Sequence, residues 1–524
     1  MRRVRLLVQW VALLAWPSGG ALADLLVVPD DFPTIQAALD AAAGGDSVMI
    51  RAGTYAEALT LAGKDLTVFG ESRAEATVVT GSQARRVLDL GAGVTLGTVL
   101  SDLTFRDGAG VDRGAGIRLE GGASPTIRRC RFVANVAFCW TCDTYGGGLA
   151  AGSGSIPVIE DCLFSDNSTQ IFDLWTYGSG GAIYAGSGSN LTIRRSTFRG
   201  NVAVAFEGGP GGAIFVSTAG VASVEECTFD GNGAGGGAGI FSEGIVEVLR
   251  STFTANQASY GTGIFCRGTF LLAENILFDN ECFGASESGG TVLVDGSGHV
   301  RRNTIAFNRG SCPDAGIVAW SMAGLAIANN IVAMNGGIGM VIEAPVPGTF
   351  ACNDVWGNER GGAPANYCGG CPDLTGIDGN ISRDPLFCDG PDRDLRLHLD
   401  SPCAPGAGAC GLIGALGEGC GVSAVAGTEP GPAAGLVVDP RQNPAAPPIT
   451  IAFTLAAGGA VRLRIHDAAG RAVVSLGGGA LAPGRHEVVW DGRTAGGRPA
   501  AAGVYFVELE AVGERRSERL VLIR

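Results

Sequence analysis

Two carboxyl-bearing residues, Asp143 and Asp173, lie among aromatic residues in two neighbouring units of a sequence repeat. These units are longer than the others, and we call their extra residues insertions. A pair of carboxyl groups about 5–9.5 Å apart can catalyse glycoside hydrolysis, with one group as the acid and the other as the nucleophile or base. Aromatic rings nearby offer flat apolar surfaces on which sugar rings can stack. The further members of this group are Trp140, Tyr145, Phe172, Trp175, Tyr177, Phe206 and Glu207.

Three interpretations of this group stay open. The aromatic rings can pack the insertions onto the body of the protein, they can line a ligand-binding groove, or the acids can act in catalysis. If a carboxylate pair acts, Asp143 and Asp173 are the candidates. No nucleophilic triad can be argued, because the chain has four histidines and only His299 lies in the repeated part.

The insertions belong to an internal repeat in which an anchor residue is followed, three positions later, by asparagine. The anchors are Phe105, Phe132, Phe164, Phe198, Phe229, Phe253, Phe278, Ile305, Val332 and Val355. Units of this length, with short apolar runs and no helical period, are typical of the coils of a parallel β-helix. The three longest units, of 32, 34 and 31 residues, are consecutive, so their extra residues should project side by side from one edge.

Alignment of the repeats on the anchor predicts which side chains point inward. Because side chains alternate along a strand, the small residues two positions before the anchor, such as Cys130 and Cys162, should share its inward face. The apolar residues five positions before it, such as Ile127, should also be buried. The asparagines should take left-handed corners and hydrogen-bond along the axis. These are Asn135, Asn167, Asn201, Asn232, Asn256, Asn308, Asn335 and Asn358.

Charged residues just before the anchor mark a bend in each coil. Strands of adjacent coils lie about 4.8 Å apart, so each charge should face an opposite one and help to fix the register. Chance alternation along a solvated edge stays the alternative. Glycine pairs before the next strand, such as Gly180-Gly181, suit a tight corner because glycine tolerates positive φ. Three positions before the anchor the residues are Asp102, Arg129, Asp161, Arg195, Glu226, Arg250, Asn275 and Arg302.

The remaining segments indicate how the chain is divided. Residues 1–23, with a basic start, an apolar core and a small-residue cleavage site, are predicted to be a signal peptide. An amphipathic helix after Pro33 should cap the first coil of a β-helix spanning 24–421, which becomes rich in cysteine from about residue 359. Residues 422–448 have the composition of a linker, and 449–524 alternate like the strands of a small antiparallel sandwich.

Charge and cysteine content limit the function classes. The formal net charge of −14 argues against binding to nucleic acid, whose phosphates need Lys and Arg. Fifteen cysteines in an exported chain predict disulfides, with at least one thiol left over. The pairs Cys139-x-x-Cys142 and Cys368-x-x-Cys371 have zinc-ligand spacing, but no histidine is near, so disulfides are favoured.

No metal or other cofactor is expected. The acidic composition leaves calcium open, but no Asp-rich calcium motif repeats along the chain. No segment after the signal peptide has the roughly 20 apolar residues that a transmembrane helix needs. The sequence therefore predicts a protein without a transmembrane segment once the signal is cleaved.

Three segments resemble known families. The opening, Asp31-Phe32-Pro33-Thr34-Ile35-Gln36 to Ala52-Gly53-Thr54-Tyr55, resembles that of the pectin lyase-like superfamily of right-handed parallel β-helices, pectinesterases included. The GGAI and FxxN signatures resemble the repeats of polymorphic outer-membrane proteins, which are surface adhesins. Val489-Trp490-Asp491-Gly492 and Gly503-Val504-Tyr505-Phe506 resemble the Ig-like domain of flagellar hook-capping proteins and the sorting domains of type IX secretion substrates.

The resemblances imply an all-β protein: a right-handed parallel β-helix with an N-terminal capping helix, followed by a small antiparallel Ig-like sandwich. Two functions fit this fold. One is a non-catalytic secreted or cell-surface protein for adhesion or glycan binding, with an extracellular polysaccharide or a surface glycan as partner and secretion machinery that recognises the C-terminal domain. The other is a polysaccharide lyase or glycoside hydrolase acting at the aromatic, acidic edge. The first is preferred, because the Gly-His-Gly and Gly-Arg-Pro-Trp blocks of related enzymes are missing.

Overall fold

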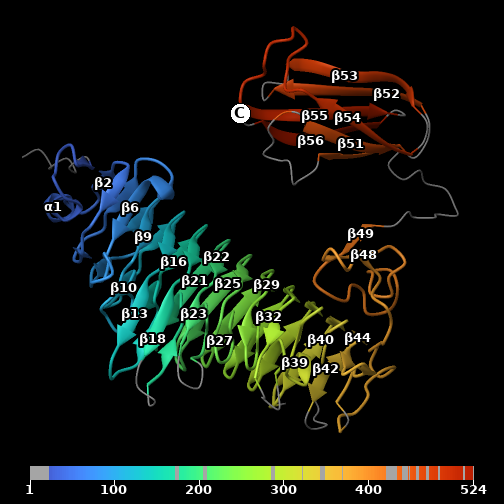
Figure 1. The fold of residues 1–524 in the computed structure, drawn as a ribbon, viewed down its shortest axis with the longest axis horizontal. Coiled ribbons are helices and arrows are strands. Elements are labelled where there is room, and N and C mark those ends of the chain that lie inside the picture. The colour runs from blue at the N-terminus through green and yellow to red at the C-terminus, as the bar shows by residue number, and fades with distance from the viewer. Residues whose placement is uncertain are drawn as a thin grey trace, which may run out of the picture. The chain divides into compact units, whose positions relative to one another are not determined.

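The chain folds into two compact units, Met1–Val422 and Ser423–Arg524 (Figure 1). The computed structural model describes residues 23–524 except 172–175, 205–208, 285–288, 322, 343–348, 369, 421–433, 439–446, 448, 456–458, 468–470, 482–483, 512–513 and 523–524. The predicted signal peptide, apart from residue 23, lies outside the described part.

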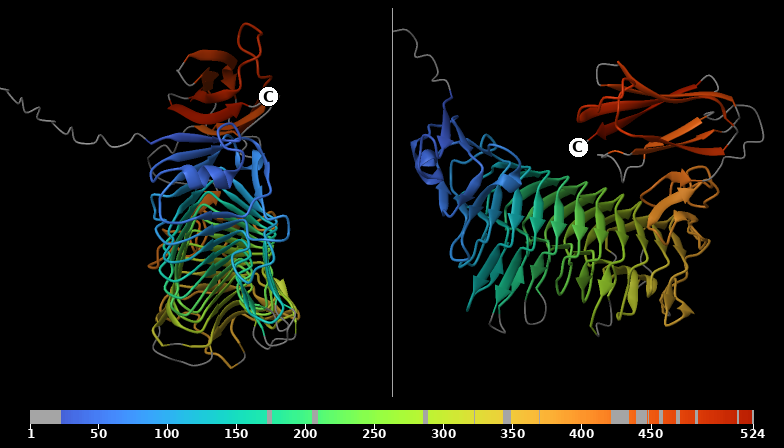
Figure 2. Two further views of the ribbon diagram at one scale, coloured as in Figure 1. Left: turned by 90° about the vertical axis from the view of Figure 1, so that its left-hand side faces the viewer. Right: turned by 45° about the horizontal axis from the view of Figure 1, so that its top comes forward.

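The first unit is a parallel β-helix whose three long sheets, A, B and C, run along its axis (Figures 1 and 2). Each coil passes from A to B to C, and each strand pairs in parallel with its counterpart one coil away. The coils therefore stack as the repeat predicts.

Sheet A consists of β1 (Leu25–Val28), β2 (Ser47–Ile50), β5 (Thr67–Gly70), β8 (Val99–Ser101), β11 (Thr126–Arg128), β16 (Val158–Glu160), β21 (Asn190–Arg194), β25 (Val221–Glu225), β28 (Ile245–Leu249), β32 (Thr269–Ala273), β36 (Ser297–Arg301), β40 (Leu325–Ala328) and β43 (Thr349–Ala351). Sheet B consists of β3 (Gly53–Tyr55), β6 (Thr77–Thr80), β9 (Thr104–Arg106), β12 (Arg131–Val133), β17 (Leu163–Ser165), β22 (Thr197–Arg199), β26 (Thr228–Asp230), β29 (Thr252–Thr254), β33 (Ile276–Phe278), β37 (Thr304–Ala306), β41 (Ile331–Ala333) and β44 (Asp354–Trp356). Sheet C consists of β4 (Leu59–Leu61), β7 (Leu88–Leu90), β10 (Ile117–Leu119), β15 (Leu149–Ala151), β20 (Ile183–Ala185), β24 (Ile214–Val216), β27 (Ile240–Ser242), β31 (Ile264–Cys266), β35 (Val292–Val294), β39 (Asp314–Ala319) and β42 (Ile338–Ile342).

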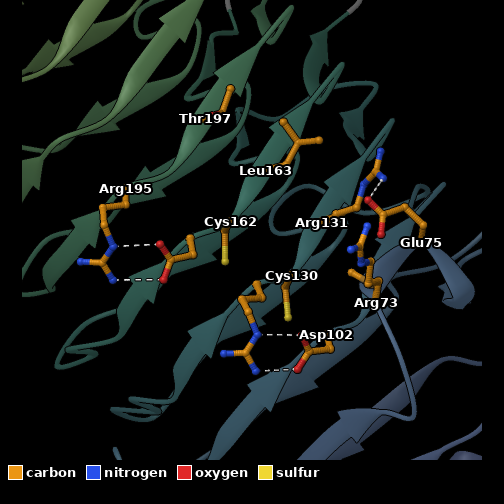
Figure 3. A pocket seen from close by; sticks show the side chains of 12 residues that line it. Arg73, Glu75, Asp102, Cys130, Arg131, Cys162, Leu163, Arg195 and Thr197 are labelled. Carbon is orange, nitrogen blue, oxygen red and sulfur yellow. Dashed lines mark hydrogen bonds and ion pairs between the residues drawn. The ribbon is translucent and has the colours of Figure 1, made fainter. Parts of the chain in front are cut away.

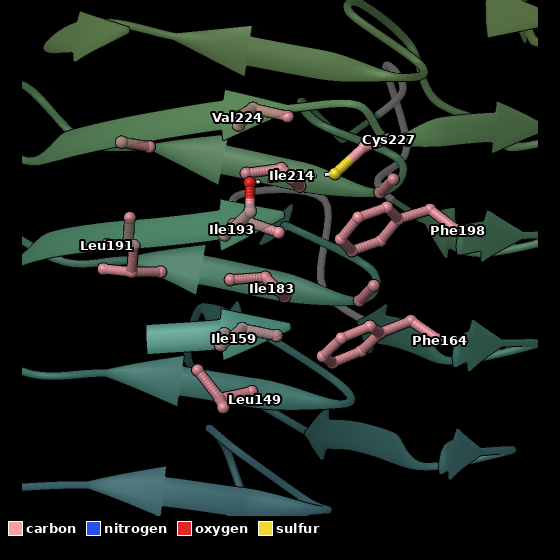
Figure 4. Close-up of a cluster of buried hydrophobic side chains, with 14 of the residues drawn as sticks. Leu149, Ile159, Phe164, Ile183, Leu191, Ile193, Phe198, Ile214, Val224 and Cys227 are labelled. Carbon is pink, nitrogen blue, oxygen red and sulfur yellow. Dashed lines mark hydrogen bonds between the residues drawn. The ribbon is translucent and has the colours of Figure 1, made fainter. Parts of the chain in front are cut away.

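The phenylalanine anchors form one interior stack, as predicted. Phe132 pairs with Phe105 on one side and with Phe164 on the other, and Phe164 pairs with Phe198. The rings of Phe132 and Phe164 lie almost parallel, with centroids 4.3 Å apart. Figure 4 shows Phe164 and Phe198 in the core beside Ile159, one of the residues predicted to be buried five positions before the anchor.

The anchor predicted at Phe278 is wrong by one residue. Leu277 pairs with Phe253 on one side and with Ile305 on the other, and it is buried. Phe278 points to the opposite, outer face, because successive side chains of a strand alternate. With Leu277 as the anchor, Asn275 is the inward residue two positions before it and is buried, although the alignment on Phe278 had placed it at the charged bend. Glu274 occupies the bend instead, with φ 60°.

Two ladders of buried asparagine amides run along the axis. In each ladder the Nδ2 of one asparagine donates to the Oδ1 of the next, at 2.8–3.2 Å. The predicted amide column is confirmed, but the left-handed corner is the residue before each asparagine, such as Ala134 with φ 53°. The longer ladder contains Asn135, Asn167, Asn201, Asn232, Asn256, Asn280, Asn308, Asn335, Asn358 and Asn366. The shorter one contains Asn275, Asn303, Asn330, Asn353 and Asn380.

The bend between sheets A and B is a single left-handed residue in most coils. Its charges pair in twos on the early coils, whereas from Glu226 to Arg302 they form a continuous chain of ion pairs through Arg250 and Glu274. The guanidinium of Arg129 donates to both carboxylate oxygens of Asp102 at 2.8 and 2.7 Å, and that of Arg195 donates to Asp161 at 2.8 and 3.0 Å. In the described part of the chain no ion pair joins Arg129 to Asp161, so the predicted ladder of charges is not continuous there. These pairs are partly exposed, so each contributes about 0–1 kcal/mol.

Helix α1 (Ile35–Ala41) caps the N-terminal end of the β-helix, as predicted. The Thr34 side chain accepts a hydrogen bond from the Ala37 backbone N–H, and the apolar face of α1 is buried among strands of the first coils. This arrangement covers the open end of the stack, where unpaired strand edges would otherwise face solvent.

The cysteine-rich segment after residue 359 first continues the stack, where Tyr367 bridges Met340 and Ile381 bridges Asp354, and it then folds back over the outer face of sheet B. Leu397, Cys403 and Ile413 pack against Ile331 and Ala333 of β41. The disulfide Cys352–Cys410 fastens this flap, which comprises residues 381–420, to the β-helix, and Cys388–Cys420 joins two parts of the flap to each other. The short strands of this region are β45 (Glu359–Arg360), β46 (Ala363–Pro364), β47 (Phe387–Asp389), β48 (Asp394–His398) and β49 (Glu418–Cys420).

The second unit is a small antiparallel sandwich with Trp490 in its core. Its first strand lies inside the segment predicted as a linker and pairs with the second. One sheet contains β50 (Ala434–Val438), β51 (Ile449–Leu455) and β54 (Gly484–Trp490). The other contains β52 (Gly459–Asp467), β53 (Ala472–Leu481), β55 (Gly503–Ala511) and β56 (Glu514–Leu522).

Candidate functional site

The three long insertions lie side by side, as predicted, and their first strands form a small parallel sheet of β13 (Val136–Cys139), β18 (Ser168–Ile171) and β23 (Val202–Ala203) (Figure 1). A second pair, β14 (Thr144–Tyr145) and β19 (Gly178–Ser179), returns the first two insertions to the coil. We call these five strands and the described residues between them the insertion edge. On later coils, β30 (Gln257–Ala258), β34 (Glu281–Cys282) and β38 (Arg309–Gly310) form a similar strip.

Two aromatic side chains of the insertion edge face solvent. Trp140 is 66% exposed and Tyr177 is 52% exposed. Trp140 lies in a four-residue loop closed by the Cys139–Cys142 disulfide, and its ring packs edge-on against Phe138 at 5.3 Å. The disulfide and the ring contact hold a large apolar surface at the rim of the coil.

Tyr145 packs onto the coil instead. Its ring lies 4.5 Å from that of Tyr184, and the Arg113 guanidinium lies over it at 5.5 Å from the ring centroid. Burial and the neighbouring Asp143 carboxylate raise the pKa of Tyr145 to about 12. This side chain therefore follows the packing interpretation, while Trp140 and Tyr177 do not.

The Asp143 carboxylate joins two consecutive insertions. Its Oδ2 accepts a hydrogen bond from the Tyr145 hydroxyl at 3.0 Å, and its Oδ1 accepts one from the backbone N–H of Tyr177 at 2.8 Å. Both oxygens thus hold the shape of the insertion edge. The structure brings together Trp140, Asp143, Tyr145 and Tyr177 of the predicted group. The predicted residues Phe172, Asp173, Trp175, Phe206 and Glu207 lie outside the described residues.

Sequence reasoning missed a second aromatic stack on the outer face of sheet C. Tyr184, Phe215, Phe241 and Phe265 pair in register on successive coils, and the phenylalanines are at most 7% exposed. The Arg267 guanidinium lies over the last two rings. The signal in the sequence is the aromatic residue that follows isoleucine in the four glycine motifs from Gly180 to Ile264, which the alternation of strand side chains places outward.

The cysteines divide into five disulfides and five buried thiols. The spacings Cys139-x-x-Cys142 and Cys368-x-x-Cys371 both form disulfides, so the preference over zinc is confirmed. Burial raises the pKa of Cys130 and of Cys227 to about 12, so these thiols stay protonated and unreactive near neutral pH.

Asp354 and Cys403 form a buried pair beneath the flap. The thiol donates to Oδ2 of Asp354 at 3.2 Å, and the backbone N–H of Arg383 donates to Oδ1 at 3.0 Å. Burial raises the pKa of Asp354 to about 7. The acid therefore holds the flap to β44 and belongs to the fold rather than to an open site.

A groove lies along the bend between sheets A and B on the early coils (Figure 3). Its volume is about 480 Å³, and its walls carry arginine and acidic side chains. The charged residues that line it are Arg73, Glu75, Asp102, Arg129, Arg131, Asp161 and Arg195. Asp102 with Arg129 and Asp161 with Arg195 are the pairs of the bend described above.

Two further observations concern metal ions and membranes. Among the residues that the structure describes, no three His, Cys, Asp or Glu side chains gather in a way that could hold a metal ion. Within the same residues, no helix has the length and apolar character needed to cross a membrane.

Three solved structures show limited similarity to this chain. No curated protein matches the chain. A structure of PorZ, a surface component of the type IX secretion system of Porphyromonas gingivalis, shares 28% identity over 17% of this chain and 12% of its own, with a TM-score of 0.14. The PL6 family alginate lyase AlyGC shares 15% identity over 65% of this chain and 52% of its own, with a TM-score of 0.38. A rice weevil pectin methyl esterase shares 15% identity over 54% of this chain and 92% of its own, with a TM-score of 0.31.

Two families match the sequence directly. The FlgD Ig-like domain matches residues 445–514, within the C-terminal sandwich. The right-handed β-helix region matches two overlapping stretches, 91–238 and 212–372, which together span more than half of the chain. Since this match and the stacked parallel sheets describe the same coils, the chain belongs to the right-handed β-helix family.

Proposed function

We propose that the protein is a secreted or cell-surface β-helix that binds a glycan at the insertion edge without cleaving it. The observation that carries this proposal is the exposure of Trp140 and Tyr177 on neighbouring coils of a rigid edge. Aromatic rings held in place lose little conformational entropy on binding and present a flat apolar face, which suits a sugar ring.

The contacts of Asp143 support binding rather than hydrolysis. A general acid or base must lie within hydrogen-bond reach of the proton that it transfers to or from the substrate. Both oxygens of Asp143 already accept hydrogen bonds from Tyr145 and from the backbone of Tyr177. The carboxylate is therefore directed toward its own insertions.

Secretion is supported by the disulfides. Such bonds persist in oxidising compartments and are rare in the cytosol of most organisms.

The C-terminal Ig-like domain would serve as an export or attachment module, and mass spectrometry of the surface-bound protein tests this role. Loss of the residues beyond about Gly421 from the surface form supports a sorting role, and an intact chain contradicts it.

A glycan array with the full secreted chain tests the proposed function. On glycans that the wild type binds, Trp140→Ala and Tyr177→Ala should each lower affinity about two- to tenfold, because an aromatic contact of this kind contributes about 0.5–1.5 kcal/mol. Ile156→Ala is the matched control, since Ile156 is 47% exposed and lies between β15 and β16, away from the edge. Equal affinity of all three variants for the bound glycans would overturn the site.

The same glycans serve a turnover assay for new reducing ends and unsaturated products. The proposal expects no products from the wild type. Products from the wild type would contradict the non-catalytic function, and their loss in Asp143→Asn with glycan binding retained would place the catalysis at the edge.

A further inference from the structure

The groove at the bend between sheets A and B has a wall that the repeat does not supply. The short helix η1 (Ala74–Ala76) lies in an extra turn between β5 and β6, where later coils have only a single bend residue. Figure 3 shows Arg73 and Glu75 from this turn opposite the bend residues of the following coils. The groove's volume of about 480 Å³ falls in the range of roughly 300–1,000 Å³ that small-ligand sites occupy.

The groove carries guanidinium groups whose hydrogen-bonding capacity is not used up. Glu75 accepts from Arg131 at 2.7 Å, but the Nε of Arg131 is buried without a hydrogen-bond partner. Among the described residues, Arg73 forms no ion pair, although it lies beside Glu75. Four arginines thus face three carboxylates, in a chain whose formal net charge is −14.

A small anion fits this arrangement best. A guanidinium binds a carboxylate or a sulfate through two parallel hydrogen bonds, and among the described residues the Arg73 guanidinium, which lines the groove, has no carboxylate in this role. Leu163 and Thr197 also line the groove and offer an apolar surface and a hydroxyl beside the charged wall. A charged group attached to a sugar ring would use all of these features.

We propose that this groove binds the acidic group, carboxylate or sulfate ester, of a glycan. The inference rests on the proposed function, because it adds a second contact to the same ligand. Arg131, Leu163 and Thr197 begin the three strands β12, β17 and β22, and the insertion edge follows the same three strands. The strand β12 spans about 10 Å and the four residues of β13 span about 13 Å more, so an oligosaccharide about 25 Å long can reach from the groove to Trp140.

Isothermal titration calorimetry on the full chain tests the groove with three probes. These are an oligogalacturonate, its methyl ester, and a sulfated galactan oligomer. The account expects the carboxylate probe, the sulfate probe or both to bind more tightly than the ester, with a preference that weakens as salt is added. The probe with the larger preference identifies which acidic group the groove accepts.

Variants separate the groove from the insertion edge. Arg73→Ala and Arg131→Ala should each lower the affinity for the preferred acidic probe about fivefold and leave the ester unchanged. Glu75→Gln should raise the affinity for the acidic probe, because it removes a competing carboxylate. Arg199→Ala is the matched control: this arginine follows Thr197 on β22, is 69% exposed, pairs with Asp230 at 3.0 Å and does not line the groove.

Equal binding of acid and ester by the wild type, or equal effects of Arg131→Ala and Arg199→Ala, would overturn the groove. If ester binding still depends on Trp140 in that case, the proposed function stands and only the groove proposal fails. Absence of binding by all three probes also overturns the groove proposal, while the glycan array tests the insertion edge independently.

Discussion

Replacement of Asn232 by alanine removes one member from the middle of the longer amide ladder. The Asn232 side chain is fully buried. Its Nδ2 donates to the carbonyl of Phe198 at 3.0 Å and to Oδ1 of Asn256 at 2.9 Å. Its Oδ1 accepts from the backbone N–H and the Nδ2 of Asn201 at 3.0 and 2.9 Å. The substitution therefore deletes four hydrogen bonds inside the β-helix.

The expected cost follows from these contacts. Each hydrogen bond contributes about 0.5–1.5 kcal/mol net, and a buried donor left without an acceptor costs about 1–3 kcal/mol. Asn201 keeps its Nδ2 contact with the carbonyl of Phe164, but its backbone N–H loses its acceptor. We expect Asn232→Ala to lower the free energy of unfolding by about 5 kcal/mol.

Urea unfolding, followed by both circular dichroism and tryptophan fluorescence, measures this loss. Two probes are needed because stacked coils can unfold in more than one step. Asn190→Ala is the control, since Asn190 is exposed at the start of β21, and it should change stability by less than about 0.5 kcal/mol. If Asn232→Ala is no more destabilising than this control, the ladder does not stabilise the stack and the reasoning fails.

Three further predictions concern the corners and the flap. Gly211→Ala should lower the free energy of unfolding by about 2–4 kcal/mol more than Gly231→Ala in the same urea assay. Both glycines have positive φ, but a Cβ at Gly211 would lie 2.5 Å from a carbonyl oxygen, whereas a Cβ at Gly231 would meet nothing within 4 Å. Equal losses would contradict this. The pKa of Asp354 is raised from 3.8 to about 7 by burial in the folded protein, so the unfolded chain loses this proton at lower pH than the folded chain does. The stability that the protonated acid provides is therefore complete below about pH 4 and is lost as the pH rises to about 7. Asp354→Asn should therefore gain stability relative to wild type between pH 4.5 and 7.5, by up to roughly 4 kcal/mol, and a constant difference would refute it. Replacing Cys352 and Cys410 by serine should free the flap and speed its proteolysis, and an unchanged cleavage rate would show that packing alone holds it.

The stack of coils could be predicted because residues of similar size and polarity recur at each interior position. Phe132, Phe164 and Phe198 share a column, and the alternation of strand side chains fixes the neighbours that point inward. The predicted anchor was wrong at Phe278, because Leu277 and Phe278 are adjacent and apolar and either could serve as the anchor. Counting back three positions from Asn280 would have selected Leu277, because the amide ladder fixes the register more tightly than the apolar residue does.

The details of the candidate site depend on contacts between residues far apart in the sequence. Asp143 was predicted as a possible acid, but its partner at Tyr177 comes from the next insertion, so its structural contacts could not be read from its own segment. The groove depends on η1, which lies outside the repeat, so no column of the alignment includes Arg73 or Glu75. The exposure of Trp140 follows from a disulfide loop whose direction the spacing alone does not give.

A crystal structure of the full chain with the oligosaccharide that it binds best would show whether the insertion edge is the glycan-binding site. We expect an intact sugar ring against Trp140 or Tyr177 at the insertion edge. A cleaved sugar in the crystal, or a sugar bound elsewhere with both aromatic rings uncovered, would contradict it.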